Sequence, residues 1–503
     1  MHTPTLIRAA VAAALAMSVL PLAGAATAST PAAHNGLPDG TRQQKTLVIG
    51  VDGATFSKFA TADMPNLKGF MAQGMTSRHN LYASPMAPTL SGPGWATVAT
   101  GVWPDKHRVV DNSFTGADFA QYPDYQSRLE AADPTASTLV VGTWGPVTTD
   151  IFTGADVLEA GASDDDTAAR TVDYLTHGNP DSTFVHLDDV DHAGHDHGAA
   201  SPEYRAALEA TDVRVGRILD AVTSRPAYAG EDWLIMVTAD HGHTEAGGHG
   251  GDSPQERETF VIARGAGYAA GSVRQDVKIV DIAPTVLGHE GASVPAAWGL
   301  DGEPVPDLDA DAFDGLRSRL KPRADEVSLP DTLKGWTTTA PRGWRVDNSA
   351  MPSGGVTEWR GWSFVTDEFW TGTERGQGRE TNVRARSVFA VADSDEWDDK
   401  DHGAGRFDST LIGPSYRVPD DGTFSADYVT DYRVDGPQTG DVSISWDGGA
   451  PQLLKSYRSD VNKAERLTVS APAGADTFQL RFRYTGTNSA FWTIDQVEIH
   501  DAG

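Results

Sequence analysis

The sequence predicts an α/β domain with a mostly parallel sheet covered by helices on both faces, followed by an all-β sandwich. Two observations predict the first part: short apolar runs alternate with helix-like segments, and each run ends in polar residues. A third predicts the second part, because helical periodicity stops after about Gly302 and short β-type runs then alternate with Gly, Asp and Pro turns.

The strands of the first part are expected where the apolar runs are continuous. These runs cover residues 46–51, 138–142, 182–187, 232–238 and 259–263. Continuous runs are typical of strands buried on both faces of a parallel sheet. Ligands of such sheets bind at the carboxyl ends of the strands, so the polar residues there are the candidate functional residues.

The helices between these runs are expected from their start and stop signals. They cover residues 64–73, 163–175, 201–222 and 281–287. Ser163 is followed by three aspartates, which suit the first turn of a helix, and Ser201 precedes Pro202. The acidic and histidine-rich segment 188–198 is expected to be a loop.

Residues 87–112 contain the candidate nucleophile. Ser91 precedes Gly92 and Pro93. The apolar run that follows stops at Gly101, which predicts a short helix with Ser91 at its N-terminus. Unpaired backbone N–H groups and the helix dipole favour an anion at such a position. A serine there is also a common helix cap, so the residues downstream decide between the two roles.

After Gly302 we expect a linker over residues 303–334, with one helix at 310–320, and a jelly-roll-like β-sandwich over residues 335–503. The clearest strands of the sandwich cover residues 387–391, 441–445, 478–484 and 492–499. Eight of the 13 tryptophans lie in the sandwich. We interpret them as core or edge packing, with a sugar-binding platform as the alternative.

One acidic cluster of the sandwich has the composition of a calcium site. Asp393, Asp395 and Asp398 offer hard oxygen ligands in one turn-like segment. A solvated turn without an ion is the alternative interpretation.

The composition limits the classes of function. A formal net charge of -30, from 70 acidic and 40 basic residues, argues against a nucleic-acid polymer or an anionic membrane as the partner. The chain has no cysteine, which excludes disulfides, thiolate metal ligands and a cysteine nucleophile. Any metal must therefore be held by histidines and carboxylates.

The N-terminus has the pattern of a signal peptide. An apolar run over residues 9–20 and the small residues that follow predict a signal peptide over residues 1–28 and export of the mature protein. The run is too short to persist as a membrane span, and without cysteine there is no lipoprotein anchor. We therefore expect a secreted protein without a membrane anchor.

Histidines and aspartates gather at the ends of the predicted strands. Seven of the 15 histidines fall between His186 and His249. Seven oxygen and nitrogen ligands are available for two cations, namely Asp52, Ser91, Asp191, His195, Asp240, His241 and His249. A set of this kind without thiolates suits Zn²⁺ or Mn²⁺ in a hydrolase.

In this pattern the chain resembles the alkaline phosphatase superfamily, and most closely its nucleotide pyrophosphatase/phosphodiesterase branch. The resemblance covers roughly residues 46–302 and implies a metal-dependent phosphohydrolase domain over residues 45–302. It rests on motifs in this order: Asp52-Gly53, Pro88-Thr89-Leu90-Ser91-Gly92-Pro93, Asp111-Asn112, Asp191 to Gly198, Asp240-His241-Gly242 and His249-Gly250.

The resemblance implies a role for each of these residues. One zinc would be held by Asp191, His195 and His249, and the other by Asp52, Asp240, His241 and the Ser91 oxygen. Asn112 and the backbone N–H of Gly92 would hold a phosphoryl oxygen. In the chemistry of the family one metal activates Ser91 for in-line attack on phosphorus, and the other stabilises the leaving oxygen and then activates water.

One departure from the branch limits what the resemblance implies. Its members often carry a threonine followed by an aromatic residue that helps to hold a nucleotide base, where this chain has Ser91 and Gly92. Selectivity for nucleotides therefore does not carry over to this chain.

The register of the histidine-rich segment leaves a second assignment open. Asp188 and His192 have the same four-residue spacing as the pair of ligands chosen above. The later pair is preferred because Gly194 and Gly198 then match the family pattern.

These observations predict a secreted two-metal phosphoric ester hydrolase with a serine nucleophile, most closely a phosphodiesterase or nucleotide pyrophosphatase, that acts on a small phosphoester. No arginine is placed to clamp a dianionic terminal phosphate, which favours a diester. A phosphomonoesterase or a phosphonate hydrolase on the same scaffold is the alternative of the same class. The alternative of another class is a secreted protein that binds glycans through its C-terminal sandwich.

Overall fold

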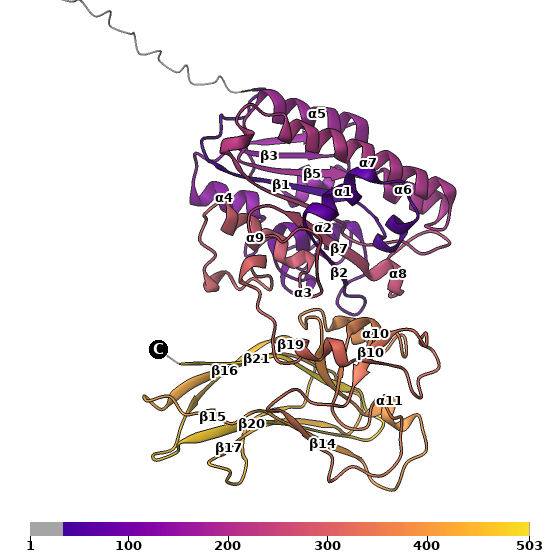
Figure 1. Cartoon of the computed structure of the whole chain (residues 1–503), viewed down its shortest axis with the longest axis vertical. Helices are drawn as coiled ribbons and strands as arrows, with labels where there is room; N and C mark the ends of the chain where they lie inside the picture. The colour runs from indigo at the N-terminus through magenta and orange to yellow at the C-terminus, as the bar shows by residue number, and fades with distance from the viewer. Residues whose placement is uncertain (1–33, 502–503) are drawn as a thin grey trace, which may run out of the picture. The chain divides into compact units, whose positions relative to one another are not determined.

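A computed structural model describes residues 34–501, and the predicted signal peptide over residues 1–28 lies outside this range. The described chain forms an α/β part followed by two antiparallel sheets (Figure 1). No helix in this range is both long enough and apolar enough to span a bilayer. The predicted fold class is confirmed.

An eight-stranded sheet organises the α/β part of the described chain, in the order β4-β3-β5-β1-β6-β7-β2-β8. Its strands are β1 (Gln44–Val51), β2 (Met75–Asn80), β3 (Thr138–Gly142), β4 (Val157–Ala160), β5 (Ser182–Leu187), β6 (Asp232–Thr238), β7 (Glu258–Arg264) and β8 (Ser272–Arg274). The first five strands in this order, β4, β3, β5, β1 and β6, run parallel to one another. Strand β7 runs antiparallel to β6 and β2, so the sheet is mixed but mostly parallel.

Helices cover both faces of this sheet (Figure 1). They are α1 (Pro65–Gln73), α2 (Ser91–Thr100), α3 (Pro104–His107), α4 (Tyr125–Ala132), α5 (Asp164–His177), α6 (Asp189–His197), α7 (Pro202–Thr223), α8 (Pro254–Arg257) and α9 (Ile282–His289). Alternate residues of β1 point to opposite cores: Leu47 and Ile49 pack with α1, α5 and α7, and Val48 packs with α2, α4 and α9. This two-sided burial explains why the strand is continuously apolar.

The predicted loop over residues 188–198 is wrong, because the segment forms helix α6. Asp189 and Asp191 occupy its first turn and His195 its last turn, where the helix dipole favours their charges. Gly198, with a φ of 81°, ends the helix. The segment lacks a stripe of apolar residues at helical spacing, so its sequence did not predict a helix.

Two antiparallel sheets form the second part of the described chain. The first has the order β19-β16-β21-β13-β12-β10-β9, and the second has the order β11-β14-β20-β17-β18, with β15 beside β20. The strands of the first sheet are β9 (Lys321–Pro322), β10 (Lys334–Thr337), β12 (Ser363–Val365), β13 (Phe389–Asp393), β16 (Thr423–Tyr432), β19 (Val461–Ser470) and β21 (Phe491–Asp501). Those of the second are β11 (Arg345–Asp347), β14 (Phe407–Ile412), β15 (Tyr416–Arg417), β17 (Thr439–Trp446), β18 (Gln452–Tyr457) and β20 (Thr477–Gly486).

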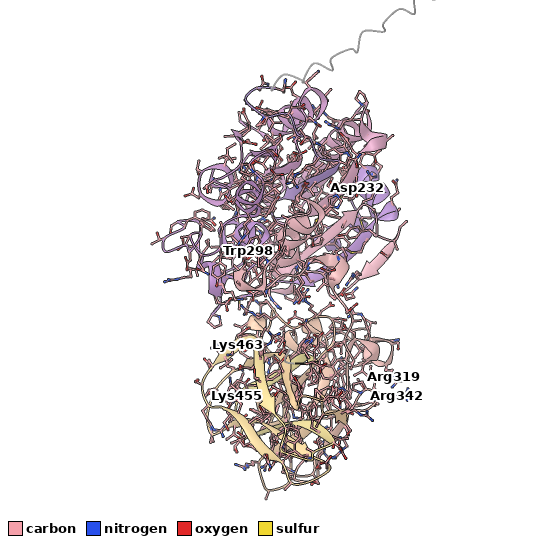
Figure 2. The ribbon with its side chains drawn as sticks, turned by 90° about the vertical axis from the view of Figure 1, so that its left-hand side faces the viewer. Asp232, Trp298, Arg319, Arg342, Lys455 and Lys463 are labelled. Carbon is pink, nitrogen blue, oxygen red and sulfur yellow. The ribbon has the colours of Figure 1, made fainter. Side chains whose placement is uncertain are left out.

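Aromatic side chains fill the core between these sheets. Seven of the eight tryptophans of this part are buried, namely Trp336, Trp344, Trp359, Trp362, Trp370, Trp397 and Trp492. They pack as the predicted core, and the sugar-binding alternative gains no support from them. Charged side chains such as Lys455 and Lys463, which both pair with Glu465, lie on strands β18 and β19 (Figure 2).

The predicted linker packs against the sandwich. Phe313, Leu316 and Leu320 are buried in the core of the sandwich. The helix expected at residues 310–320 is the shorter 3₁₀ helix Asp314–Arg319, which contains Gly315, a weak helix former.

Buried ion pairs join segment 379–387 of the second part to the α/β part. Arg386 donates to both carboxylate oxygens of Asp281, at 2.7 and 2.8 Å. Arg384 donates to both oxygens of Asp301, at 2.9 and 3.0 Å. Bidentate pairs of this kind fix orientation as well as distance.

We expect Arg386→Met to destabilise the protein, because the Asp281 side chain is fully buried and would lose its cation. Breaking a buried pair from one side costs about 3–5 kcal/mol. Arg466→Met is the control: the Arg466 side chain is 68% exposed beside Asp427, and such pairs contribute at most about 1 kcal/mol. Urea unfolding should show a lower midpoint for the first variant only, and equal midpoints for both variants would contradict this expectation.

Candidate active site

Helix α2 places Ser91 at the carboxyl edge of the sheet. Ser91 is the first residue of the helix, after Leu90 at the cap position, and Gly101 ends the helix with a φ of 73°. A Cβ atom at Gly94 would lie 2.7 Å from Cβ of Asp240, so only glycine lets the first turn pack against this aspartate. Ser91 and Asp240 are thereby brought together from segments that are far apart in the sequence.

The Ser91 hydroxyl faces two of the predicted ligands. Its Oγ lies 3.5 Å from Oδ1 of Asp52 and 3.3 Å from Nε2 of His241. The other oxygen of Asp52 accepts hydrogen bonds from Nε1 of Trp95 at 2.8 Å and pairs with Nε2 of His186 at 2.9 Å. These two partners fix the Asp52 carboxylate with Oδ1 toward the serine.

Asp52, Asp240 and His241 form a first cluster of ligand atoms, all within 4.8 Å of one another. Nδ1 of His241 lies 3.1 Å from the carbonyl oxygen of Gly242, an acceptor, so this nitrogen carries the proton and Nε2 is free to bind a cation. Oδ2 of Asp240 is buried and accepts no hydrogen bond from the described residues. A buried carboxylate oxygen without a donor fits a bound cation.

A second cluster forms where α6 meets the loop that follows β6. Nε2 of His195 lies 3.4 Å from Oδ2 of Asp191 and 3.0 Å from Nε2 of His249. Nδ1 of His249 donates to the carbonyl oxygen of Thr89 at 2.7 Å, which leaves its Nε2 for the cluster. Two imidazole nitrogens at this separation need a shared proton or a cation between them.

The charges of the two clusters favour cations. Burial raises the pKa of Asp240 well above its usual value, and the nearby carboxylates of Asp52 and Asp191 raise it further. Burial is the main cause, and the nearby His249 the second, of a pKa of His241 that is lowered to about 3. Its imidazole is therefore neutral at pH 7. Metal ligands must be deprotonated, which this environment provides for His241.

The structure also shows how the two candidate pairs of α6 differ. Nε2 of His192 lies 3.0 Å from Oδ2 of Asp188, so both pairs use the same helical spacing. Asp191, however, converges with His241, His243 and His249 in one group of ligand atoms, whereas Asp188 groups with Asp52 and His186 of β5. His195 is not a member of these groups but lies beside His249.

Asn112 lies beside the N-terminus of α2. The backbone N–H of Gly92 donates to Oδ1 of Asn112 at 2.7 Å. A Cβ atom at position 92 would lie 2.8 Å from the carbonyl oxygen of Asp111, so this segment excludes any side chain at Gly92. A phosphoryl oxygen could take this N–H only if Asn112 turned its amide.

A cavity of about 360 Å³ joins these residues. Its lining includes Ser91 and Asn112, and from the second cluster Asp191, His195 and His249. Trp144, at the end of β3, adds an aromatic wall that the sequence motifs did not indicate. The cavity is of a size for a small phosphoester.

Comparison with known proteins places the chain in a family. The family of type I phosphodiesterases and nucleotide pyrophosphatases matches residues 46–149 and 120–349, more than half of the chain. The chain belongs to this family. The resemblance drawn from the motifs is confirmed.

The curated relatives match only a part of this chain, and this chain spans only a small part of their length. GPI ethanolamine phosphate transferase 1 of Aspergillus oryzae is 31% identical over 118 residues, 24% of this chain and 11% of the relative. The catalytic subunit of GPI ethanolamine phosphate transferase 3 of Mus musculus is 27% identical over 163 residues, 32% of this chain and 14% of the relative.

Two solved structures match about half of the chain at low similarity. Murine ectonucleotide pyrophosphatase/phosphodiesterase 5, in complex with AMP, has a TM-score of 0.41 at 15% identity and covers 53% of this chain and 99% of its own. The phosphonate monoester hydrolase of Agrobacterium radiobacter has a TM-score of 0.41 at 16% identity, over 53% of this chain and 78% of its own.

His243 is a further residue of the site, and its role was not predicted from the sequence. Its side chain is fully buried, and its Nε2 lies 2.7 Å from Oδ1 of Asp191. A Cβ atom at Gly53 or Gly194 would lie 2.6 to 2.9 Å from the imidazole ring. The second histidine of the sequence Asp240-His241-Gly242-His243 was the available signal.

We expect His243→Leu to weaken Zn²⁺ binding at the second cluster about 10- to 100-fold, because Asp191 would lose the partner that orients it. His243→Gln should recover part of the affinity, since an amide can donate to the same oxygen. The control is His197→Leu, which changes an exposed histidine of α6, the helix that also carries Asp191. Equilibrium dialysis against buffered Zn²⁺ measures all three variants, and equal affinities would contradict the orienting role.

The predicted calcium ligands face different partners. Oδ2 of Asp393 accepts a hydrogen bond from Trp370 at 2.9 Å, and Asp398 pairs with His402. Asp393, Asp395 and Asp398 are not among the groups of ligand atoms that converge within 4.8 Å in residues 34–501. A calcium site here stays a prediction.

Proposed function

We propose that this chain is an exported two-metal phosphodiesterase with Ser91 as its nucleophile. The observation that carries the proposal is the convergence of the Ser91 hydroxyl with Asp52 and His241, beside a second ligand cluster in the same cavity. Membership of the phosphodiesterase family makes the chain an enzyme that acts on phosphoesters. Export rests on the N-terminal pattern.

The residues fit two divalent ions, Zn²⁺ or Mn²⁺. Asp52, Asp240, His241 and the Ser91 oxygen would hold one. Asp191, His195 and His249 would hold the other, since Nε2 of His195 lies 3.4 Å from Asp191 and 3.0 Å from His249. When bound, such ions supply Lewis-acid stabilisation of charged phosphoryl oxygens and lower the pKa of a nearby hydroxyl. The buried Asp240 oxygen without a hydrogen-bond donor supports this assignment.

The residues of the chain would then act in sequence. Ser91 Oγ forms a bond to phosphorus as the bond from phosphorus to the leaving oxygen breaks, and water later hydrolyses the phosphoseryl ester. The N-terminus of α2 favours the negative charge of the phosphoryl group, and the N–H of Gly92 would add a hydrogen bond once Asn112 turns its amide. Trp144 would contact the organic part of the substrate.

The lining of the cavity favours a diester. No arginine or lysine of the described chain lines it, so nothing there would neutralise the second charge of a terminal phosphate. The buried tryptophans give no support to the alternative of glycan binding through the sandwich.

We expect the zinc-loaded protein to hydrolyse bis(4-nitrophenyl) phosphate faster than 4-nitrophenyl phosphate. Initial rates of nitrophenol release under identical conditions compare the two. Faster cleavage of the monoester would contradict the assignment and favour a phosphomonoesterase. Because the partial relatives are named as transferases, adding an alcohol acceptor would show whether the phosphoryl group passes to a group other than water.

A further inference from the structure

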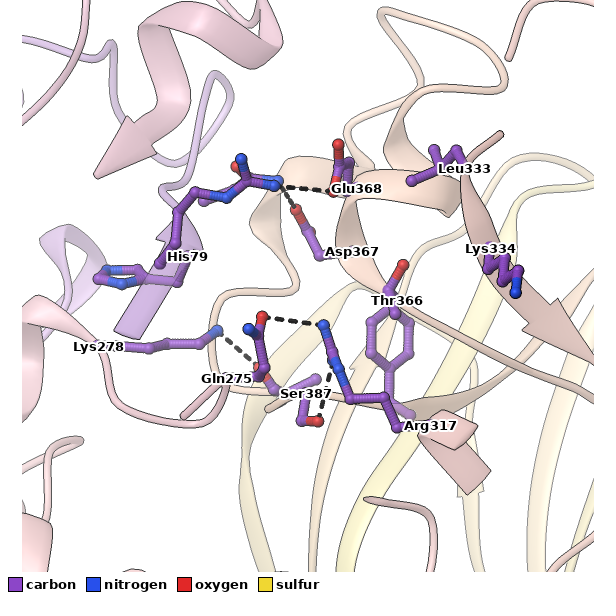
Figure 3. A pocket seen from close by; sticks show the side chains of 14 residues that line it. His79, Gln275, Lys278, Arg317, Leu333, Lys334, Thr366, Asp367, Glu368 and Ser387 are labelled. Carbon is purple, nitrogen blue, oxygen red and sulfur yellow. Dashed lines mark hydrogen bonds and ion pairs between the residues drawn. The ribbon is translucent and has the colours of Figure 1, made fainter. Parts of the chain in front are cut away.

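A second cavity, of about 100 Å³, lies where the α/β part, the linker and the sandwich meet (Figure 3). Four cations line it, namely Arg78, Lys278, Arg317 and Lys334, together with two carboxylates, Asp367 and Glu368. This excess of positive charge is unexpected in a chain with a net charge of -30. The cavity is separate from the active site, because the two share no lining residue.

The two carboxylates of this cavity already have cationic or amide partners. Glu368 pairs with Arg78 at 3.3 Å. Asp367 pairs with Arg257 at 3.1 Å and accepts a hydrogen bond from Asn80 at 2.7 Å. Asp367 and Glu368 are therefore paired with groups other than Lys278, Arg317 and Lys334.

The other three cations lack an anionic partner. No carboxylate oxygen of residues 34–501 lies within 4.0 Å of the charged nitrogens of Lys278, Arg317 or Lys334. Among the described residues, the Lys278 side chain donates to the carbonyl oxygens of Val383 and Ala385, at 2.6 Å each. Arg317 donates to neutral side-chain oxygens, at 2.9 and 3.3 Å (Figure 3).

Two groups in the lining of the cavity, Lys278 and His79, are buried. Lys278 is 6% exposed, and burial, with the nearby Arg386, lowers its pKa to about 8 in spite of the more distant carboxylates of Asp281, Asp367 and Asp495. His79 accepts a hydrogen bond from the N–H of Ile279 at its Nε2, so its Nδ1 carries the proton. That buried Nδ1 has no hydrogen-bond partner among the described residues.

We propose that this cavity binds a small tetrahedral oxyanion of the size of phosphate. Arginine and lysine are the side chains that recognise such anions, through charge-assisted hydrogen bonds. A volume of about 100 Å³ is enough for an anion of the size of phosphate. The anion would connect Lys278 of the α/β part with Arg317 of the linker and with Lys334, the first residue of strand β10.

The test measures bound phosphate on the full metal-loaded chain. Equilibrium dialysis with labelled inorganic phosphate gives the number bound per chain, and competitive inhibition of diester hydrolysis by phosphate reports the active site separately. The double variant Arg317→Gln/Lys334→Gln changes two exposed side chains, so it should fold. We expect it to bind one phosphate fewer than the wild type, with the inhibition constant unchanged.

The control is Arg319→Gln, an exposed arginine of the same 3₁₀ helix that does not line the cavity (Figure 2). It should bind as much phosphate as the wild type. Sulfate should displace the phosphate from this site, whereas acetate should not, because it is planar and carries one charge. Equal phosphate binding by the wild type and the double variant would overturn the proposal, as would displacement by acetate alone.

Discussion

Ser91→Ala should abolish diester hydrolysis while leaving both metals bound. The change removes only the hydroxyl that faces Asp52 and His241, and none of the carboxylates or imidazoles of the two clusters. Removing a nucleophile typically lowers kcat by about 10⁴- to 10⁶-fold. Turnover of bis(4-nitrophenyl) phosphate and metal content per chain, measured on the same preparation, check both halves of the expectation.

Thr89→Ala is the matched comparison for Ser91→Ala. The Thr89 hydroxyl lies two positions before Ser91 but donates to the carbonyl oxygen of Gly251 at 3.0 Å and accepts from the N–H of Gly250 at 3.0 Å. It holds the loop of His249 and is not free to attack. We expect a much smaller loss for Thr89→Ala, and full activity of Ser91→Ala would show that the nucleophile is elsewhere.

Asp240→Asn should have opposite effects on the metal-loaded and metal-free protein. With metal, the variant loses a carboxylate ligand, so one ion should be lost and activity should fall by at least about 10³-fold. Without metal, the same change removes a carboxyl whose ionisation is opposed by burial and, next, by the carboxylates of Asp52 and Asp191. Because the pKa of the folded-state carboxyl is raised, Asp240 destabilises the metal-free protein increasingly as the pH rises above the unfolded-state pKa.

Thermal unfolding at pH 7 tests this difference in sign. Asp240→Asn should raise the midpoint of chelator-treated protein and lower the midpoint of zinc-loaded protein, and each unit by which the pKa is raised corresponds to about 1.4 kcal/mol. Asp220→Asn, at an exposed aspartate of α7, is the control and should change neither midpoint. A lower midpoint of Asp240→Asn in both states would argue that Asp240 has only a structural role.

The sheet and most of the candidate ligands were accessible from sequence because parallel strands end at one edge. Asp52 follows β1 directly and Asp240 comes two residues after the end of β6, so the pairing of these two strands places them at the same edge of the sheet. Strand β2 was missed, because its sequence Met-Thr-Ser-Arg-His-Asn is not apolar and its place in the sheet comes from pairing with β7 and β8. Tertiary context overrides local propensity at such positions.

The rest of the site depends on contacts that have no local pattern. His186 lies in the middle of a strand pattern, and only the fold shows that its ring holds Asp52. Trp144 becomes a wall of the cavity only because α6 and α2 lie opposite it. The cationic cavity joins Arg78 with Glu368, residues separated by 290 positions, which no motif connects.

The most direct test of the account is to identify the covalent intermediate. The zinc-loaded protein is mixed with bis(4-nitrophenyl) phosphate, quenched with acid during turnover and digested for mass spectrometry. We predict a 4-nitrophenyl phosphate ester on Ser91, formed as one nitrophenolate leaves, and its absence in Ser91→Ala. An adduct on another residue, or rapid turnover by Ser91→Ala, would contradict the assignment of Ser91 as the nucleophile.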